Sequence, residues 1–259
     1  MTARPMIAVL ERELLKLLRQ RGRLLSSMVR PLLWLMVIGA GFKAQTLLVP
    51  GVLGMTLLFG AMLAALSTVY DKESGVMRML VIAPLGHYWI ALAKTVGATL
   101  AALVQALMLL VLLALLGYVS LHVSISLLVV GLIGTAFACA SLGMLVAAWS
   151  RTLENYATMM NLVIFPVFFL SGSLYPVQQL PAVLRLIATL NPYTYGVDLL
   201  KHAAIAGPTV ASAADFRLGL DLAVLSGFSA AALAVAGVRF SRDTATEPLV
   251  HRLAHKQSD

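Results

Sequence analysis

Two serines and one histidine are the side chains whose types could carry out covalent chemistry. Ser171 and Ser173 follow an apolar run, and His202 lies further along the chain. A hydroxyl activated by an imidazole is a common hydrolytic nucleophile, so one hypothesis is an intramembrane enzyme that uses Ser171 or Ser173. The favoured interpretation is structural: the serines cap or bend a helix, and His202 lies near a helix end. The chain also has no Gly-x-Ser-x-Gly nucleophile elbow.

Motifs for metals and nucleotides are weak or missing. His251 and His255 are spaced as neighbours on a helix, but two histidines alone are a weak metal signal, and a solvated tail is the better interpretation. No Gly-x-x-x-x-Gly-Lys-Ser/Thr motif occurs, so the chain lacks the loop with which P-loop ATPases hold phosphate. We therefore expect no catalytic residue, no metal site and no cofactor in this chain.

A charged stretch, residues 71–84, separates two long apolar runs. Its ionisable residues are Asp71, Lys72, Glu73 and Arg78. Each charge at the centre of a spanning helix costs about 2.5–3.5 kcal/mol on insertion scales, so this stretch is expected in water or against a partner. We predict a short amphipathic helix with Asp71 and Glu73 at its N-terminus and Pro84 at its end. A solvated loop is the alternative.

Composition indicates a polytopic membrane protein with an all-α fold. Of the 259 residues, 60% are hydrophobic and only 12% are charged, whereas soluble domains carry about 25% charged residues. The apolar runs suit bilayer-crossing helices, and alternating strand patterns are absent. The net charge of +8 is concentrated at the chain ends, as on cytoplasmic flanks, and requires no nucleic-acid partner.

The hydropathy pattern predicts six transmembrane helices in a single domain, 1–259. They cover approximately residues 24–42, 50–69, 89–116, 125–149, 156–170 and 218–238. Residues 1–23 are amphipathic and are predicted to lie in the membrane interface. Basic residues lie before the first span and in the tail, 239–259, and they favour a cytoplasmic location for both termini. We expect the protein in the inner cell membrane.

Residues 171–216 form neither a clean span nor a polar loop. Helix-breaking residues interrupt them at Gly172, Pro176, Pro181, Asn191 and Pro192, and Tyr193 begins a second short helical piece. Half-apolar segments at membrane depth are tolerated where they pack against protein or line a cavity. We therefore predict re-entrant helices on the outer side, shaped by these residues.

Charged residues within the predicted spans are sparse, which bears on the class of transporter. Four of them fall near predicted span ends: Lys94, Asp198, Lys201 and Asp221. Ion-coupled carriers usually place ionisable groups inside the membrane. This pattern argues against the interpretation as a stand-alone secondary transporter or channel, which stays the alternative function.

Two segments together resemble the permease subunits of ABC type-2 exporters. Residues 73–84, Glu-Ser-Gly-Val-Met-Arg-Met-Leu-Val-Ile-Ala-Pro, are similar to that family's cytoplasmic pattern between the second and third spans. The residues that match it are Glu73, Gly75, Arg78, Leu80 and Pro84. Residues 169–193, which contain Leu-Ser-Gly-Ser-Leu-Tyr-Pro and Asn-Pro-Tyr, are similar to the stretch after the fifth span. Lys201 departs from the pattern, because many relatives carry arginine there.

The resemblance implies partners and a mechanism. Such permeases pair as dimers in the lipid bilayer and bind two copies of a separate ATP-binding subunit, which holds ATP and Mg²⁺. Residues 71–84 would be the coupling helix seated on that subunit, with residues 1–23 beside it, and the re-entrant region would cap the exit. The expected function is export of a drug, lipid, glycolipid or other small molecule.

Overall fold

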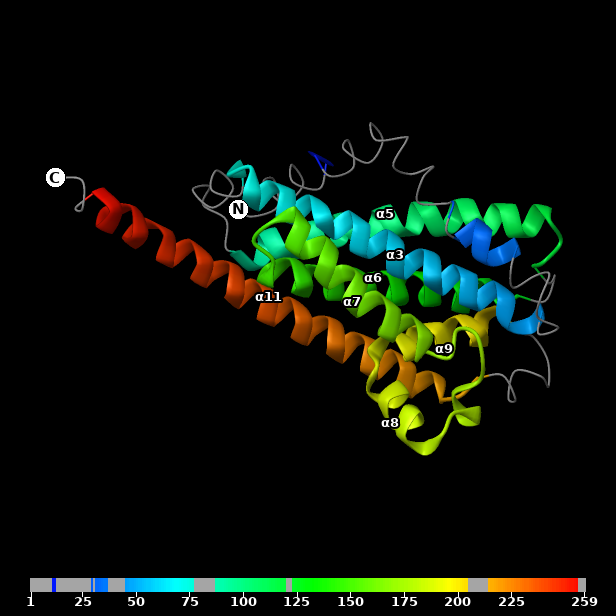
Figure 1. Ribbon diagram of the computed structural model, residues 1–259. Coiled ribbons are helices and arrows are strands. Elements are labelled where there is room, and N and C mark those ends of the chain that lie inside the picture. Colours follow the sequence, from blue (N-terminus) through cyan, green and yellow to red (C-terminus); the bar gives the residue numbers. More distant parts are fainter. Residues whose placement is uncertain are drawn as a thin grey trace.

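The computed structural model describes residues 11–12, 29, 31–36, 45–76, 87–119, 123–204 and 214–255, and the regular elements of this part of the chain are helices (Figure 1). In chain order they are α3 (Gln45–Glu73), α5 (His87–Leu115), α6 (Ile125–Trp149), α7 (Leu153–Phe169), η1 (Val177–Gln179), α8 (Ala182–Leu190), α9 (Pro192–Ala204) and α11 (Leu218–His255). The prediction of an all-α fold is confirmed for these described residues.

Four helices in the described ranges are long and apolar enough to cross a membrane. Their apolar stretches are Leu47–Glu73, Tyr88–Leu115, Ile125–Trp149 and Leu218–Phe240. They correspond to the second, third, fourth and sixth predicted spans. The fifth corresponds to α7, which has only 17 residues, and most of the predicted first span lies outside the described residues. A polytopic membrane protein is therefore supported, while the count of six spans stays a prediction.

Helix α3 lies at the centre of the bundle. It packs against α5, α6, α7 and α9, and nearly all of its apolar stretch is buried by the rest of the chain. Figure 1 shows α11 crossing the bundle obliquely, with its C-terminal end extending beyond the other helices. Much of α11 is exposed within this chain, as expected for a helix that faces lipid or another subunit.

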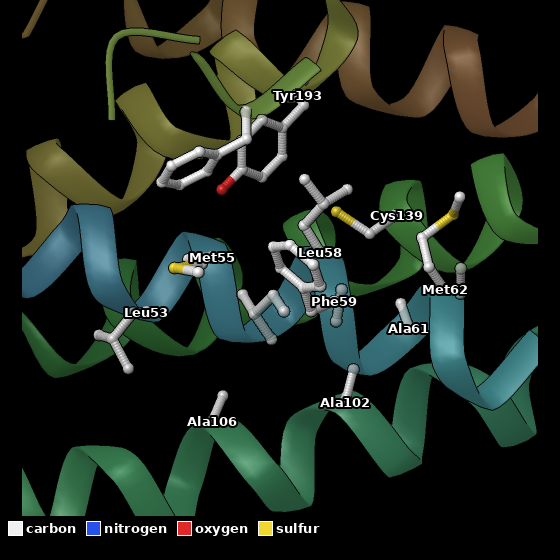
Figure 2. Packing of buried hydrophobic residues seen from close by; sticks show 14 of the residues in the cluster. Leu53, Met55, Leu58, Phe59, Ala61, Met62, Ala102, Ala106, Cys139 and Tyr193 are labelled. Carbon is white, nitrogen blue, oxygen red and sulfur yellow. The ribbon is translucent and has the colours of Figure 1, made fainter. Parts of the chain in front are cut away.

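Small side chains allow the central helices to approach closely. Ala102 and Ala106 of α5 point toward α3 (Figure 2). On the α6 side, a Cβ added at Gly143 would lie 2.9 Å from the Cβ of Ala65, closer than real Cβ contacts. Because lipid tails are as apolar as leucine, such close packing rather than hydrophobic exclusion holds membrane helices together.

The prediction that Asp71 and Glu73 begin a helix is wrong. Both lie in the last turn of α3, which ends at Glu73. The helix ends because Gly75 adopts a left-handed conformation, with φ of +74°, and its N–H donates to the carbonyl of Lys72 at 3.1 Å. Such a glycine is a common C-terminal helix stop. Residues 77–86, and with them Arg78, Leu80 and Pro84, lie outside the described residues.

Candidate functional site

The last turn of α3 carries three consecutive ionisable residues, Asp71, Lys72 and Glu73, which together with Gly75 we call the charged end of α3. A carboxylate in a last helical turn meets the negative end of the helix dipole, so it needs other partners. Each of the three side chains contacts a different part of the bundle. Their contacts show how this short stretch connects the helices.

Asp71 is fully buried and holds two basic side chains. Its Oδ2 lies 2.5 Å from Nζ of Lys94 on α5, and its Oδ1 accepts a hydrogen bond from Nη2 of Arg12 at 2.9 Å. The Lys94 side chain is only 1% exposed. Burying a charge is costly unless it is paired and hydrogen-bonded. The Asp71 carboxylate therefore fixes the end of α3 to α5 and to Arg12.

Lys72 connects α3 to the end of α6 and to α11. Its Nζ donates to the carbonyl oxygens of Ala147 and Ala148 at 3.0 and 3.1 Å. These carbonyls belong to the last turn of α6, where a cation complements the helix dipole. The same ammonium lies 4.6 Å from the ring centroid of Phe240 on α11.

Glu73 connects α3 to the start of α7. Its Oε2 accepts a hydrogen bond from the backbone N–H of Leu153, the first residue of α7, at 3.0 Å. The carboxylate thus does lie at a helix N-terminus, where the dipole favours it, but that helix is α7. Glu73 is also solvent-exposed. Beside it, a Cβ added at Gly75 would meet nothing within 4 Å.

The predicted re-entrant residues surround the chain reversal after α7. Gly172 has φ of +74°, and a Cβ there would lie 2.7 Å from Cγ2 of Val177. Pro176 and Pro181 directly precede η1 and α8, and Pro192 is the first residue of α9. Proline suits such positions because it has no N–H to leave unpaired.

Asn191 joins α7, α8 and α9 through its side chain. Its Nδ2 donates to the carbonyl of Val167 at 2.7 Å, and its Oδ1 accepts from the N–H of Tyr193 at 3.1 Å. Tyr193 is buried and points toward α3 and α6 (Figure 2). These contacts fit residues that shape the turn, and the roles of the re-entrant residues stay predictions.

The two serines and His202 have different hydrogen-bond partners. Ser171 Oγ donates to the carbonyl of Phe168 at 2.6 Å and lies 2.6 Å from Ser173 Oγ. His202 Nε2 instead lies 3.1 Å from the carbonyl of Phe216. The serine contacts are those of a helix end, which favours the structural interpretation over an enzyme.

Five residues from α9, α11 and the segment between them form a second buried group, which we call the polar cluster: Asp198, Lys201, His202, Asp215 and Asp221. It lies at the opposite end of α6 from Lys72, since Ala203 accepts a hydrogen bond from Ser124, just before α6 begins. Its members lie on two helices and the segment between them, and sequence reasoning missed their assembly. The spacing Asp198-x-x-Lys201-His202 was the available signal, because such residues share one helix face.

Asp198 is the centre of the polar cluster. Its two carboxylate oxygens accept the backbone N–H groups of Asp215 and Phe216 at 2.7 and 2.9 Å, and Lys201 Nζ lies 2.7 Å from Oδ2 of Asp215. Burial raises the pKa of Asp198 above its ordinary value, and the two N–H groups and Lys201 oppose that effect. The carboxylate thus holds the segment before α11 against α9.

Comparison with known proteins gives a consistent family. The sequence profile of the family described as ABC-2 type transporter matches residues 5–204. The ycf38 protein of Porphyra purpurea, whose name assigns it provisionally to the transport permeases, is 27% identical over 211 residues, covering 75% of this chain and 72% of that protein. The ycf38 protein of Cyanophora paradoxa is 25% identical over 214 residues, covering 76% and 72%.

A shorter similarity is found to nodulation protein J of Rhizobium leguminosarum bv. trifolii. It is 39% identical over 82 residues, which cover 32% of this chain, so the match spans only 30% of that relative's length. The profile match is the broader finding, because it includes α3 to α9 and thus most of the described bundle. The chain therefore belongs to the ABC-2 type transporter family, whose members are multi-pass membrane permeases without an ATPase domain and pair with ATP-binding subunits.

Proposed function

We propose that this chain is the membrane-spanning subunit of an ATP-driven exporter that receives its driving force at the charged end of α3. The observation that carries this proposal is the convergence of contacts there. Asp71 bonds to Lys94 on α5, Lys72 bonds to the end of α6 and contacts α11, and Glu73 bonds to the start of α7. A force applied to this turn acts on four other helices at once.

This convergence suits the coupling role that the family resemblance implies. A coupling element works when it is packed against structure that has two discrete arrangements, so that both partners bias the same equilibrium. The open space around Gly75 is where a partner surface would approach. We assign Glu73, Gly75, Arg78, Leu80 and Pro84 to the contact with the ATP-binding subunit, which holds ATP and Mg²⁺.

The family resemblance suggests the subunits of the complex, and the basic residues that flank the spans suggest its orientation in the membrane. We propose two permease copies and two ATP-binding subunits, with both termini and residues 71–84 on the cytoplasmic side, since basic flanks favour that side. The re-entrant region after α7 then lies at the outer end, where it would cap the exit path. The substrate is a drug, lipid, glycolipid or other small molecule.

Affinity purification in mild detergent tests this proposal. The parent chain is expected to retain a stoichiometric ATP-binding subunit, recognised by its P-loop in mass spectrometry, and to support ATP hydrolysis. Glu73→Ala should weaken that association or uncouple hydrolysis from transport, whereas Glu154→Ala, which removes an exposed acidic residue in the first turn of α7, should not. A parent chain that transports without an ATP-binding subunit would establish the stand-alone carrier instead.

A further inference from the structure

The polar cluster contains a buried carboxylate that lacks the partners such a group requires. Asp221, in the first turn of α11, is fully buried. Neither of its carboxylate oxygens has a hydrogen-bond partner among the residues that the structure describes. Buried polar groups are nearly always hydrogen-bonded, and an unsatisfied carboxylate indicates a missing ligand, ion or proton.

Two other potential metal ligands, His202 and Asp198, lie near the carboxylate of Asp221. Oδ2 of Asp221 lies 3.6 Å from Nε2 of His202, and Oδ2 of Asp198 lies 3.7 Å from the same nitrogen. One ligand atom from each of these three residues lies within 4.8 Å of the others. An ion with bonds of about 2.0–2.1 Å in tetrahedral geometry places its ligand atoms about 3.3 Å apart, so the spacing is close to that of a metal site.

The charges of the cluster also favour a cation. Asp198, Asp215 and Asp221 supply three carboxylates, whereas Lys201 supplies one ammonium, which lies 2.7 Å from Asp215 and 3.9 Å from Asp198. With the carboxylates ionised and His202 neutral, two negative charges remain in excess. A divalent cation balances them without any protonation.

We infer that Asp198, His202 and Asp221 bind one divalent transition-metal ion of the zinc class. An imidazole ligand favours such an ion over Mg²⁺ or Ca²⁺, which prefer oxygen ligands alone. In the metal-free arrangement, Nε2 of His202 must carry the hydrogen, because the carbonyl of Phe216 at 3.1 Å only accepts. On binding, the neutral ring carries its hydrogen on Nδ1, Nε2 coordinates the ion, and the carbonyl of Phe216 is placed to become a fourth ligand.

The bound ion would fasten α9 to the first turn of α11. Its ligands come from both helices, and the carbonyl of Phe216 comes from the segment between them. This inference does not depend on the proposed function, because the test below requires neither an ATP-binding subunit nor transport.

Zinc titration of the purified full-length chain tests the site. The background carries His251→Gln and His255→Gln, because this histidine pair could bind zinc by itself, and the affinity tag contains no histidine. After removal of metal with a chelator, calorimetry with Zn²⁺ alone should show one ion per chain. Asp221→Asn and His202→Gln should each weaken binding at least about tenfold, because even the loss of a residue that only hydrogen-bonds a metal ligand typically costs about 10–100-fold. Asp215→Asn, which removes one of the three negative charges but no proposed ligand, should weaken binding less than either ligand variant does.

Two results of the titration would overturn the inference. One is a background chain that binds no zinc, since the cluster is then neutralised by protons. The other is unchanged zinc affinity in both Asp221→Asn and His202→Gln. X-ray absorption of the zinc-loaded background chain gives an answer even if the variants fail to fold. It should show one imidazole among oxygen ligands, and a spectrum with oxygen ligands alone would contradict the site.

Discussion

The carboxylate of Glu73, at the end of α3, accepts a hydrogen bond from the backbone N–H of Leu153, at the start of α7, at 3.0 Å. Eighty positions separate the two residues in the chain, yet this bond joins the C-terminus of one helix to the N-terminus of another. Glutamate is favoured there because the positive end of the α7 dipole attracts it. The bond therefore links the position of the charged end of α3 to that of α7.

Variants of Glu73 separate this helix connection from a charge contact with the partner. Glu73→Ala should lower ATP-driven transport at least about fivefold, the lower limit of typical coupling energies, because it removes both the bond and the charge. Glu73→Gln retains an oxygen that can accept the Leu153 N–H, so transport by this variant should lie between that of the parent and that of Glu73→Ala. Reconstituted vesicles provide the measurement, and equal losses in the two variants would contradict a role for the bond.

Two glycines with the same conformation allow a matched test of the charged end. Gly75 and Gly117 have φ of +74° and +77°, and a Cβ at either would meet nothing within 4 Å. Alanine in a left-handed conformation costs about 1–2 kcal/mol, so Gly75→Ala and Gly117→Ala should lower thermal stability by similar amounts. Only Gly75→Ala should also impair ATP-driven transport. Equal transport by the two variants would argue against Gly75 as part of the coupling contact.

The buried ion pair of Asp71 and Lys94 should make the charged end sensitive to loss of one partner. Asp71→Asn is expected to destabilise the chain by about 3–5 kcal/mol, because it removes the carboxylate charge that lies 2.5 Å from the buried Lys94 ammonium. Replacing both residues by apolar ones, as in Asp71→Leu with Lys94→Met, should recover most of that loss. Unfolding in detergent measures both variants, and a stable Asp71→Asn variant would show that the pair is dispensable for the fold.

The side chain of Asn191 should contribute to stability through two distinct bonds. Asn191→Ala removes the bonds to Val167 and Tyr193 and should cost about 1–3 kcal/mol, because it leaves buried backbone groups unpaired. Asn191→Asp keeps an acceptor for the Tyr193 N–H but cannot donate to Val167 when ionised. It should therefore also lose stability in thermal unfolding, and an Asn191→Asp variant as stable as the parent would show that the Val167 bond is unimportant.

Much of the helical pattern could be predicted from the sequence. The fourth span, Ile125–Trp149, was predicted with the bounds that the structure shows, because a continuous apolar run begins and ends there. The breaks at Pro181 and at Asn191-Pro192 were also predicted, since proline in a helix interior removes a backbone hydrogen bond and disfavours the helix. These signals are local, so a single sequence contains them.

The contacts that position the site could not be predicted in the same way. The bonds of Asp71 to Lys94 and of Lys201 to Asp215 depend on how separate helices pack, and no local pattern states which charges will meet. The charges of Asp71 and Glu73 suggested a new helix, whereas Gly75 is what ends α3. A glycine two residues beyond the last charge was the signal that favoured the observed helix end.

Photo-crosslinking from the charged end of α3 tests the central claim most directly. A photoreactive residue is placed at Ser74, which is exposed just after α3, or at Tyr118, which is exposed just after α5. Irradiation of native membranes should join the chain to a P-loop protein from position 74 and not from position 118, and addition of ATP should change the yield. No such product from position 74, or equal products from the two positions, would contradict the claim that an ATP-binding subunit docks at the charged end.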